Sequence, residues 1–139
     1  MKPARRSRWF WLLLLILSWF TLTQGLRFIR ALVLWNWLES LGLWPGPGYL
    51  AFTGLMFALG GGASTYGLIR RHPWGLRLGE ITLVAWSLWN WSDRLWIARS
   101  PDALWNWPFA LIVNLILLGL LFLATSAERK RLHESQPRL

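Results

Sequence analysis

The chain has 139 residues, of which 55% are apolar, and it carries a formal net charge of +9 and no cysteine. Such a composition leaves little polar material for a soluble surface, so we expect a single membrane domain over residues 1–139. The lack of cysteine excludes disulfides, thiolate catalysis and cysteine-ligated metals. Most of the basic residues flank apolar runs, which makes them determinants of membrane topology rather than a nucleic-acid surface.

Four apolar runs are predicted to be transmembrane helices, because each is near the roughly 20 residues that a helix needs to cross about 30 Å of hydrocarbon. These runs cover residues 9–30, 49–69, 76–97 and 105–125. A short interfacial helix is expected within residues 31–43, and a basic cytoplasmic tail at 126–139. The predicted fold class is therefore all-α, an integral membrane four-helix bundle.

The distribution of Lys and Arg predicts the orientation of the bundle. Eleven of the fifteen basic residues lie before the first run, in the segment 70–77 where the second and third runs are joined, or after the fourth run. The connection at 39–48 has none. Since basic residues resist translocation, both termini are expected in the cytoplasm, and the expected location is the bacterial cytoplasmic membrane with several spans. A basic start followed by an apolar run is also typical of a signal peptide, but no small-x-small cleavage site follows residue 20.

The first run continues past Gln24 through Arg27 and Arg30. One interpretation places both guanidinium groups at the outer headgroups, with residues 31–43 lying along the membrane interface. In the other, the helix continues as a long tilted span, and Arg27 finds an acid within the bundle, with Asp93 nearest in depth. The second arrangement would indicate a functional role for Arg27.

Three Trp-Asn-Trp triplets occur, at residues 35–37, 89–91 and 105–107. The first two share a wider frame at an offset of 54 residues (89 minus 35), which is typical of a duplicated helical hairpin, although abundant tryptophan produces the same match by chance. All three triplets map to outward ends of the spans. An aromatic belt at the headgroups is one interpretation, and an outward-facing ligand pocket is the other. The candidate residues are Trp35, Trp89, Trp91 and Trp107.

Small residues recur along the second run and predict that this helix is the central contact helix of the bundle. The packing candidates are Gly54, Ala58, Gly61 and Gly62. Small side chains let helix backbones approach closely in lipid, where water no longer drives apolar association. Three consecutive glycines at 60–62 also lower helix propensity, so a hinge or unwound stretch is the alternative.

Polar residues at membrane depth are the usual indicators of a site, and the third run carries most of them. At about 100° per residue, Glu80, Ser87 and Arg94 fall on one side of this helix, with Asn90 at the edge. A polar relay along that side is one interpretation; interfacial charges with one structural hydrogen bond are the other. The candidate polar residues are Arg27, Glu80, Asn90, Asp93, Arg94 and Asn114.

Patterns typical of catalysis are missing from the sequence: there is no His-x-x-x-His, paired-carboxylate or Gly-x-Ser-x-Gly arrangement. We therefore expect no enzyme activity, no cofactor and no metal. The favoured hypothesis is a non-catalytic membrane protein that associates with itself or with a larger membrane complex and has the lipid bilayer as its surroundings. The alternative is a small-molecule or ion transporter or channel component that uses the polar groups of spans one, three and four.

Overall fold

The computed structural model describes residues 6–42, 44–97 and 105–134, apart from the side chains of residues 132 and 133. The regular structure in these ranges is entirely helical, so the all-α prediction is confirmed for them. The elements are α1 (Arg8–Val33), α2 (Trp35–Ser40), α3 (Pro47–Ile69), α4 (Pro73–Ser92), the π-helix η1 (Asp93–Ile97) and α5 (Trp107–Glu134).

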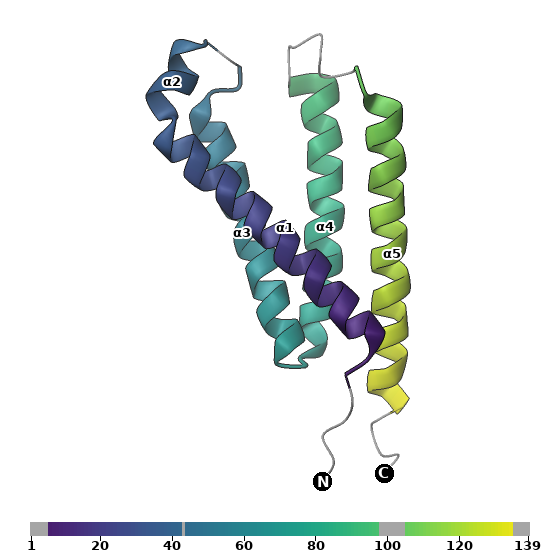
Figure 1. The fold of residues 1–139 in the computed structure, drawn as a ribbon. Coiled ribbons are helices and arrows are strands. Elements are labelled where there is room, and N and C mark those ends of the chain that lie inside the picture. The colour runs from purple at the N-terminus through teal and green to yellow at the C-terminus, as the bar shows by residue number, and fades with distance from the viewer. Residues whose placement is uncertain (1–5, 43, 98–104, 135–139) are drawn as a thin grey trace.

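The four long helices form an up-and-down bundle in the order α1, α3, α4, α5 (Figure 1). Helix α1 is oblique: it lies along α3 over much of its length, and its first turns reach the last turns of α5. We call the end that holds the start of α1, the α3–α4 turn and the last turns of α5 the base of the bundle. The opposite end, which holds α2, is called the α2 end.

Local sequence signals explain where the helices begin and end. The Ser7 hydroxyl accepts a hydrogen bond from the Phe10 backbone N–H at 3.0 Å, which caps the start of α1. Proline occupies the first positions of α3 and α4, where a missing N–H costs nothing. Helix α3 ends in a Schellman motif: the His72 N–H donates to the Gly67 carbonyl at 2.9 Å, and Arg71 adopts a φ of 59°.

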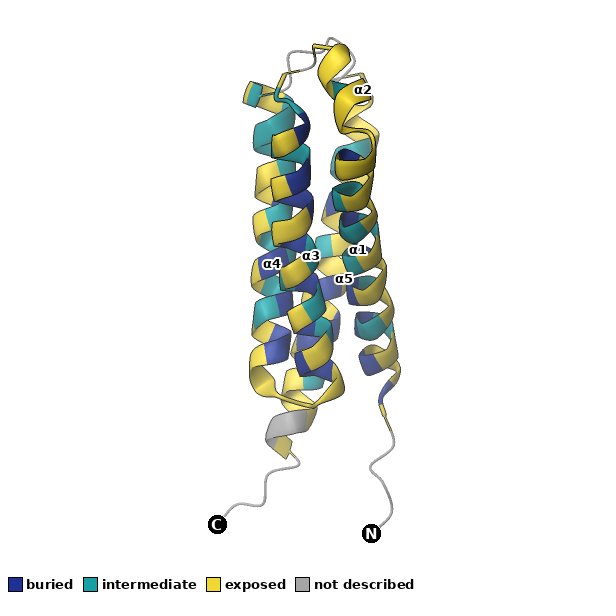
Figure 2. Ribbon diagram, turned by 90° about the vertical axis from the view of Figure 1, so that its left-hand side faces the viewer, coloured by how far each residue is buried: buried dark blue, intermediate teal, exposed yellow. Residues whose placement is uncertain are grey.

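Apolar burial is concentrated near the base, where all four long helices meet. Phe10, Leu13 and Leu17 of α1 form a cluster there with Leu68 of α3, Leu76 of α4 and Leu121 and Ala124 of α5. Figure 2 shows that buried positions alternate with exposed ones along the long helices, so the interior is a narrow stripe. The outward surface is correspondingly apolar.

Glycines on two sides of α3 let it approach both neighbours. A Cβ atom added at Gly54 would lie 2.9 Å from the Phe28 backbone nitrogen of α1, and Gly61 also faces α1. Gly54 and Gly61 are seven residues apart, and the same spacing occurs on the side of α3 that faces α4. There, Gly60 contacts Thr82, and Gly67 contacts the backbone of Gly75. Contacts this close require residues without a side chain.

Two of the described helices, α1 and α5, are long and apolar enough to cross a membrane. In the most apolar stretch of each, only 22% of the residues are buried, whereas a core helix of a soluble protein would be mostly buried. Glycine and hydroxyl residues dilute the apolar character of α3, and polar and tryptophan residues dilute that of α4. Most apolar side chains of α1 and α5 therefore face outward.

Candidate functional site

The polar residues predicted from the sequence do not form one site. They lie at three levels along the bundle: around Tyr49 at the α2 end, around Asn114 in the middle, and around Glu80 near the base. Each level has its own hydrogen-bond partners. We describe them in turn, because their separation determines what the bundle can do.

Tyr49, in the first turn of α3, is the centre of the group at the α2 end. Its hydroxyl donates to the Asp93 Oδ1 at 3.0 Å and accepts from the Trp89 indole N–H at 2.9 Å. The Tyr49 and Trp89 rings also stack, with centroids 6.2 Å apart and an interplanar angle of 25°. These contacts link α3 to the end of α4 and to η1 through side chains rather than through close backbone packing.

In the middle of the bundle, Asn114 of α5 pairs with Ser87 of α4. The Asn114 Nδ2 donates to the Ser87 hydroxyl at 2.7 Å, and the Asn114 Oδ1 lies 3.0 Å from the same hydroxyl. Both side chains are buried. An interhelical hydrogen bond of this kind stabilises a bundle in lipid by up to about 1–2 kcal/mol.

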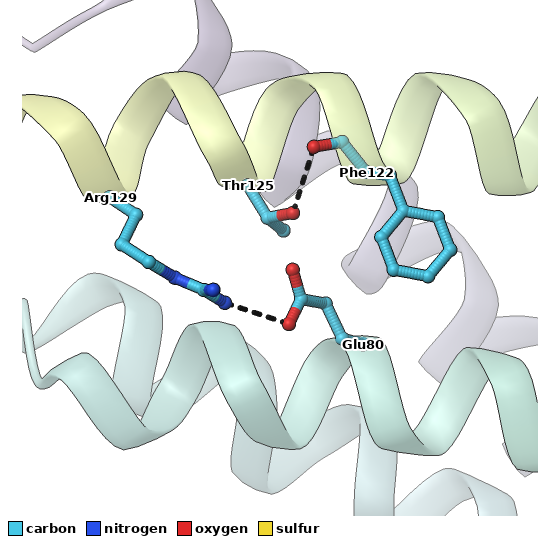
Figure 3. Close-up of polar contacts among 4 residues, drawn as sticks. All are labelled: Glu80, Phe122, Thr125 and Arg129. Carbon is cyan, nitrogen blue, oxygen red and sulfur yellow. Dashed lines mark hydrogen bonds and ion pairs between the residues drawn. The ribbon is translucent and has the colours of Figure 1, made fainter.

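Near the base, two contacts link α5 to its neighbours. The Arg129 Nη2 donates to the Glu80 Oε2 of α4 at 2.8 Å, whereas the nearby Thr125 hydroxyl donates within α5, to the Phe122 carbonyl at 3.2 Å (Figure 3). The second link comes from α1. The Ser7 hydroxyl that caps α1 donates to the Glu128 Oε2 at 2.7 Å. Glu80 and Ser87, seven residues apart on α4, therefore both face α5.

The other charged candidates lie at the α2 end. Arg27 is half-buried beside an open groove that Arg30, Trp37 and Leu38 also line, and no ion pair joins it to Asp93. Arg94, in η1, lies over the Trp91 ring with its Cζ 5.9 Å from the centroid. Asn90 is half-buried on α4.

The tryptophan triplets all lie at the α2 end, where their side chains have different contacts. Trp35 packs beside Gly48 at the start of α3, whereas Trp89 stacks on Tyr49. Trp107, in the first turn of α5, is half exposed. Of the four packing candidates on α3, Gly54 and Gly61 are buried against α1, while Ala58 and Gly62 are half-buried.

Several residues of these groups were missed by the sequence reasoning. Tyr49 is predicted only as the start of a span, although a hydroxyl in the first turn of an apolar helix can indicate a polar contact. Gln24 is not among the predicted polar candidates, but it is buried inside the bundle. Ser7 precedes an apolar helix in the manner of an N-cap, a signal that the sequence carries.

The chemistry available to these groups is limited. Among the described residues, no three His, Asp or Glu side chains gather closely enough to hold a metal ion. At each of the three levels, the described side chains form hydrogen bonds from one helix to another, and such bonds stabilise helix–helix contacts.

Comparison with known proteins adds no further constraint. No protein-family model, curated protein or solved structure matches this chain.

Proposed function

We propose that this chain is an integral membrane protein in which α1, α3, α4 and α5 all cross the bilayer, with both termini in the cytoplasm. Its proposed role is non-catalytic: helix–helix association in the membrane, with further copies of itself or as an accessory subunit of a larger complex. The proposal retains α1 in the mature bundle, in keeping with its close packing on α3.

The membrane placement is supported by the side-by-side arrangement of the four long helices. Helices α1 and α5 have the length and composition of membrane spans, and α3 and α4 lie alongside them (Figures 1 and 2). With 23 and 20 residues at about 1.5 Å rise per residue, α3 and α4 are roughly 30–35 Å long. A bilayer that α1 and α5 can span therefore also matches the length of α3 and α4.

The observation that carries the association role is the pairing of polar groups at separate levels. Asp93 is bonded to Tyr49, Asn114 to Ser87, and Glu80 to Arg129. A transport path, the alternative, needs a continuous series of polar groups facing a wet cavity. These three pairs instead bond across neighbouring helices, and each pair lies at a separate level.

The topology can be tested by cysteine labelling, because the chain has no cysteine of its own. Ser40→Cys at the α2 end and Glu134→Cys at the end of α5 are both exposed positions. A membrane-impermeant maleimide should label Ser40→Cys in intact cells and Glu134→Cys only after permeabilisation. Labelling of both from the same side, or purification of the chain as a monomer without detergent, would contradict the placement.

Association can be tested by disulfide cross-linking in native membranes, combined with the mass of the detergent-solubilised particle. Leu59→Cys on α3 and Ile116→Cys on α5 lie on outward faces, whereas Thr53→Cys is a buried control. At least one outward variant should form a cross-linked dimer or heterodimer, and Thr53→Cys should not. A monomeric particle with no cross-link from either face would refute the association role while leaving the topology intact.

A further inference from the structure

A cavity of about 300 Å³ lies between α1, α4 and α5, on the side of the bundle where α1 leans away from α5. Its wall is largely apolar and includes Ile16 and Phe20 of α1, Trp86 of α4 and Leu118 of α5. This volume is at the lower end of the range for small-molecule pockets. Leu15 and Trp19, which also line it, are each 67% exposed, so the cavity opens sideways from the bundle.

One polar group in this wall is not satisfied within the chain. Gln24 is 6% exposed, and its Oε1 accepts no hydrogen bond from any residue that the structure describes. A buried carbonyl without a partner is unfavourable, and in native proteins such groups usually have an explanation. The Thr23 hydroxyl, also in the wall, donates to the Phe20 carbonyl at 2.8 Å and retains its acceptor capacity.

The charge of the wall restricts what can bind. None of the described residues that line the cavity is a Lys, Arg, Asp, Glu or His, and the Asn114 amide in its wall is already bonded to Ser87. A charged ligand would lose its contacts with water and headgroups and would gain no counter-charge in the cavity, which is costly at this depth. An apolar chain fits the wall, and a hydroxyl group supplies the donor that Gln24 lacks.

We propose that this cavity binds a neutral, membrane-dissolved molecule with an apolar chain and a terminal hydroxyl, whose hydroxyl donates to the Gln24 amide oxygen. The Oε1 atom is covered by neighbouring atoms, so binding requires the amide to turn about its last side-chain torsion, which has a broad and shallow energy profile. This site depends on the proposed membrane placement, but it is independent of association between chains.

The test uses protein reconstituted in phosphatidylcholine nanodiscs and two photoreactive probes: a diazirine-bearing dodecanol and the matching diazirine-bearing dodecane. After illumination, the labelled peptides are identified by mass spectrometry. The alcohol should label segments 15–24, 83–86 or 114–118 more strongly than the alkane does. Since a neutral hydrogen bond contributes modestly, the expected preference is roughly fivefold to tenfold.

Variants separate recognition of the hydroxyl from filling of the cavity. Gln24→Leu should remove the preference for the alcohol while leaving alkane labelling unchanged; because it removes an unpaired polar group, thermal unfolding should show no loss of stability. Leu118→Phe should block both probes by occupying the cavity. Leu22→Phe, which adds the same bulk on an outward face of α1, is the matched control and should block neither.

Three outcomes would overturn the proposal. Equal labelling by alcohol and alkane, unchanged in Gln24→Leu, would mean that lipid chains occupy the cavity without selection. Labelling that persists in Leu118→Phe would place the bound probe elsewhere. A cross-link between the cavity and a helix of a second copy would make the occupant a partner chain. The first two outcomes can occur whether or not the cysteine test of association succeeds.

Discussion

The base and the α2 end of the bundle are held together in different ways. At the base, backbones and apolar side chains touch directly: Gly67 meets Gly75, and Leu13 lies within the main apolar cluster. At the α2 end, the helices are linked by long polar and aromatic side chains such as Tyr49 and Trp89. The difference shows that close packing and spanning side chains are alternative ways to join helices.

The largest effect should come from separating the backbones at the base. A Cβ atom at Gly75 would lie 2.6 Å from the Gly67 carbonyl carbon and 2.7 Å from the Leu68 nitrogen, and neither backbone atom can move aside alone. Gly75→Ala should destabilise the bundle by about 3 kcal/mol, measured by thermal unfolding in detergent. Gly25→Ala, where nothing lies within 4 Å, is the control and should be neutral or slightly stabilising.

The next effect concerns the apolar cluster. Leu13 is fully buried in α1, whereas Leu15 on the same helix is 67% exposed. Leu13→Ala should cost about 2 kcal/mol, because lost packing and the cavity left behind remain unfavourable even where lipid replaces water. Leu15→Ala should change unfolding by less than about 0.5 kcal/mol. Equal losses of unfolding free energy in the two variants would mean that burial in this apolar cluster does not stabilise the base.

A smaller loss is expected from the α2 end. Tyr49→Phe keeps the ring that stacks on Trp89 but removes the hydroxyl that bonds to Asp93 and to the indole N–H. The expected cost is about 1 kcal/mol, since two partly exposed hydrogen bonds are lost. Hydrogen exchange should increase in the first turns of α3 and the end of α4, and remain unchanged at the base. A global increase would show that the two ends unfold as one unit.

The smallest effect concerns the turn between α3 and α4. Arg71 has a φ of 59°, a conformation that glycine adopts without the steric cost of a Cβ atom. Arg71→Gly and Arg71→Ala both remove the side chain, so the difference between them reports on the backbone alone. The glycine variant should be more stable than the alanine variant by about 1 kcal/mol in the same unfolding assay. The reverse order would show that the turn relaxes to a different conformation.

The positions of the helices are predictable from the sequence, because apolar runs and prolines at helix starts are local signals. The all-α prediction is confirmed, whereas the number of spans, the orientation and the duplication stay predictions. The partners of polar residues were not predictable: Asn114 was placed deep in a span, but its bond to Ser87 depends on how α4 and α5 rotate against each other. Likewise, Asp93 is the predicted partner of a buried Arg27 but bonds to Tyr49. The position of a residue along a helix can be predicted from the sequence, whereas the direction in which its side chain faces within the bundle cannot.

The contact between Ser7 and Glu128 joins residues that are 121 positions apart in the chain. Glu128 is synthesised after all of α1, α3 and α4, so this contact forms only once most of α5 has been made. The pair formed by α1 and α3 has no such delay, because its glycine contacts lie within the first half of the chain. The contacts between α1 and α3 can therefore form during synthesis before the contacts that α5 makes at the base.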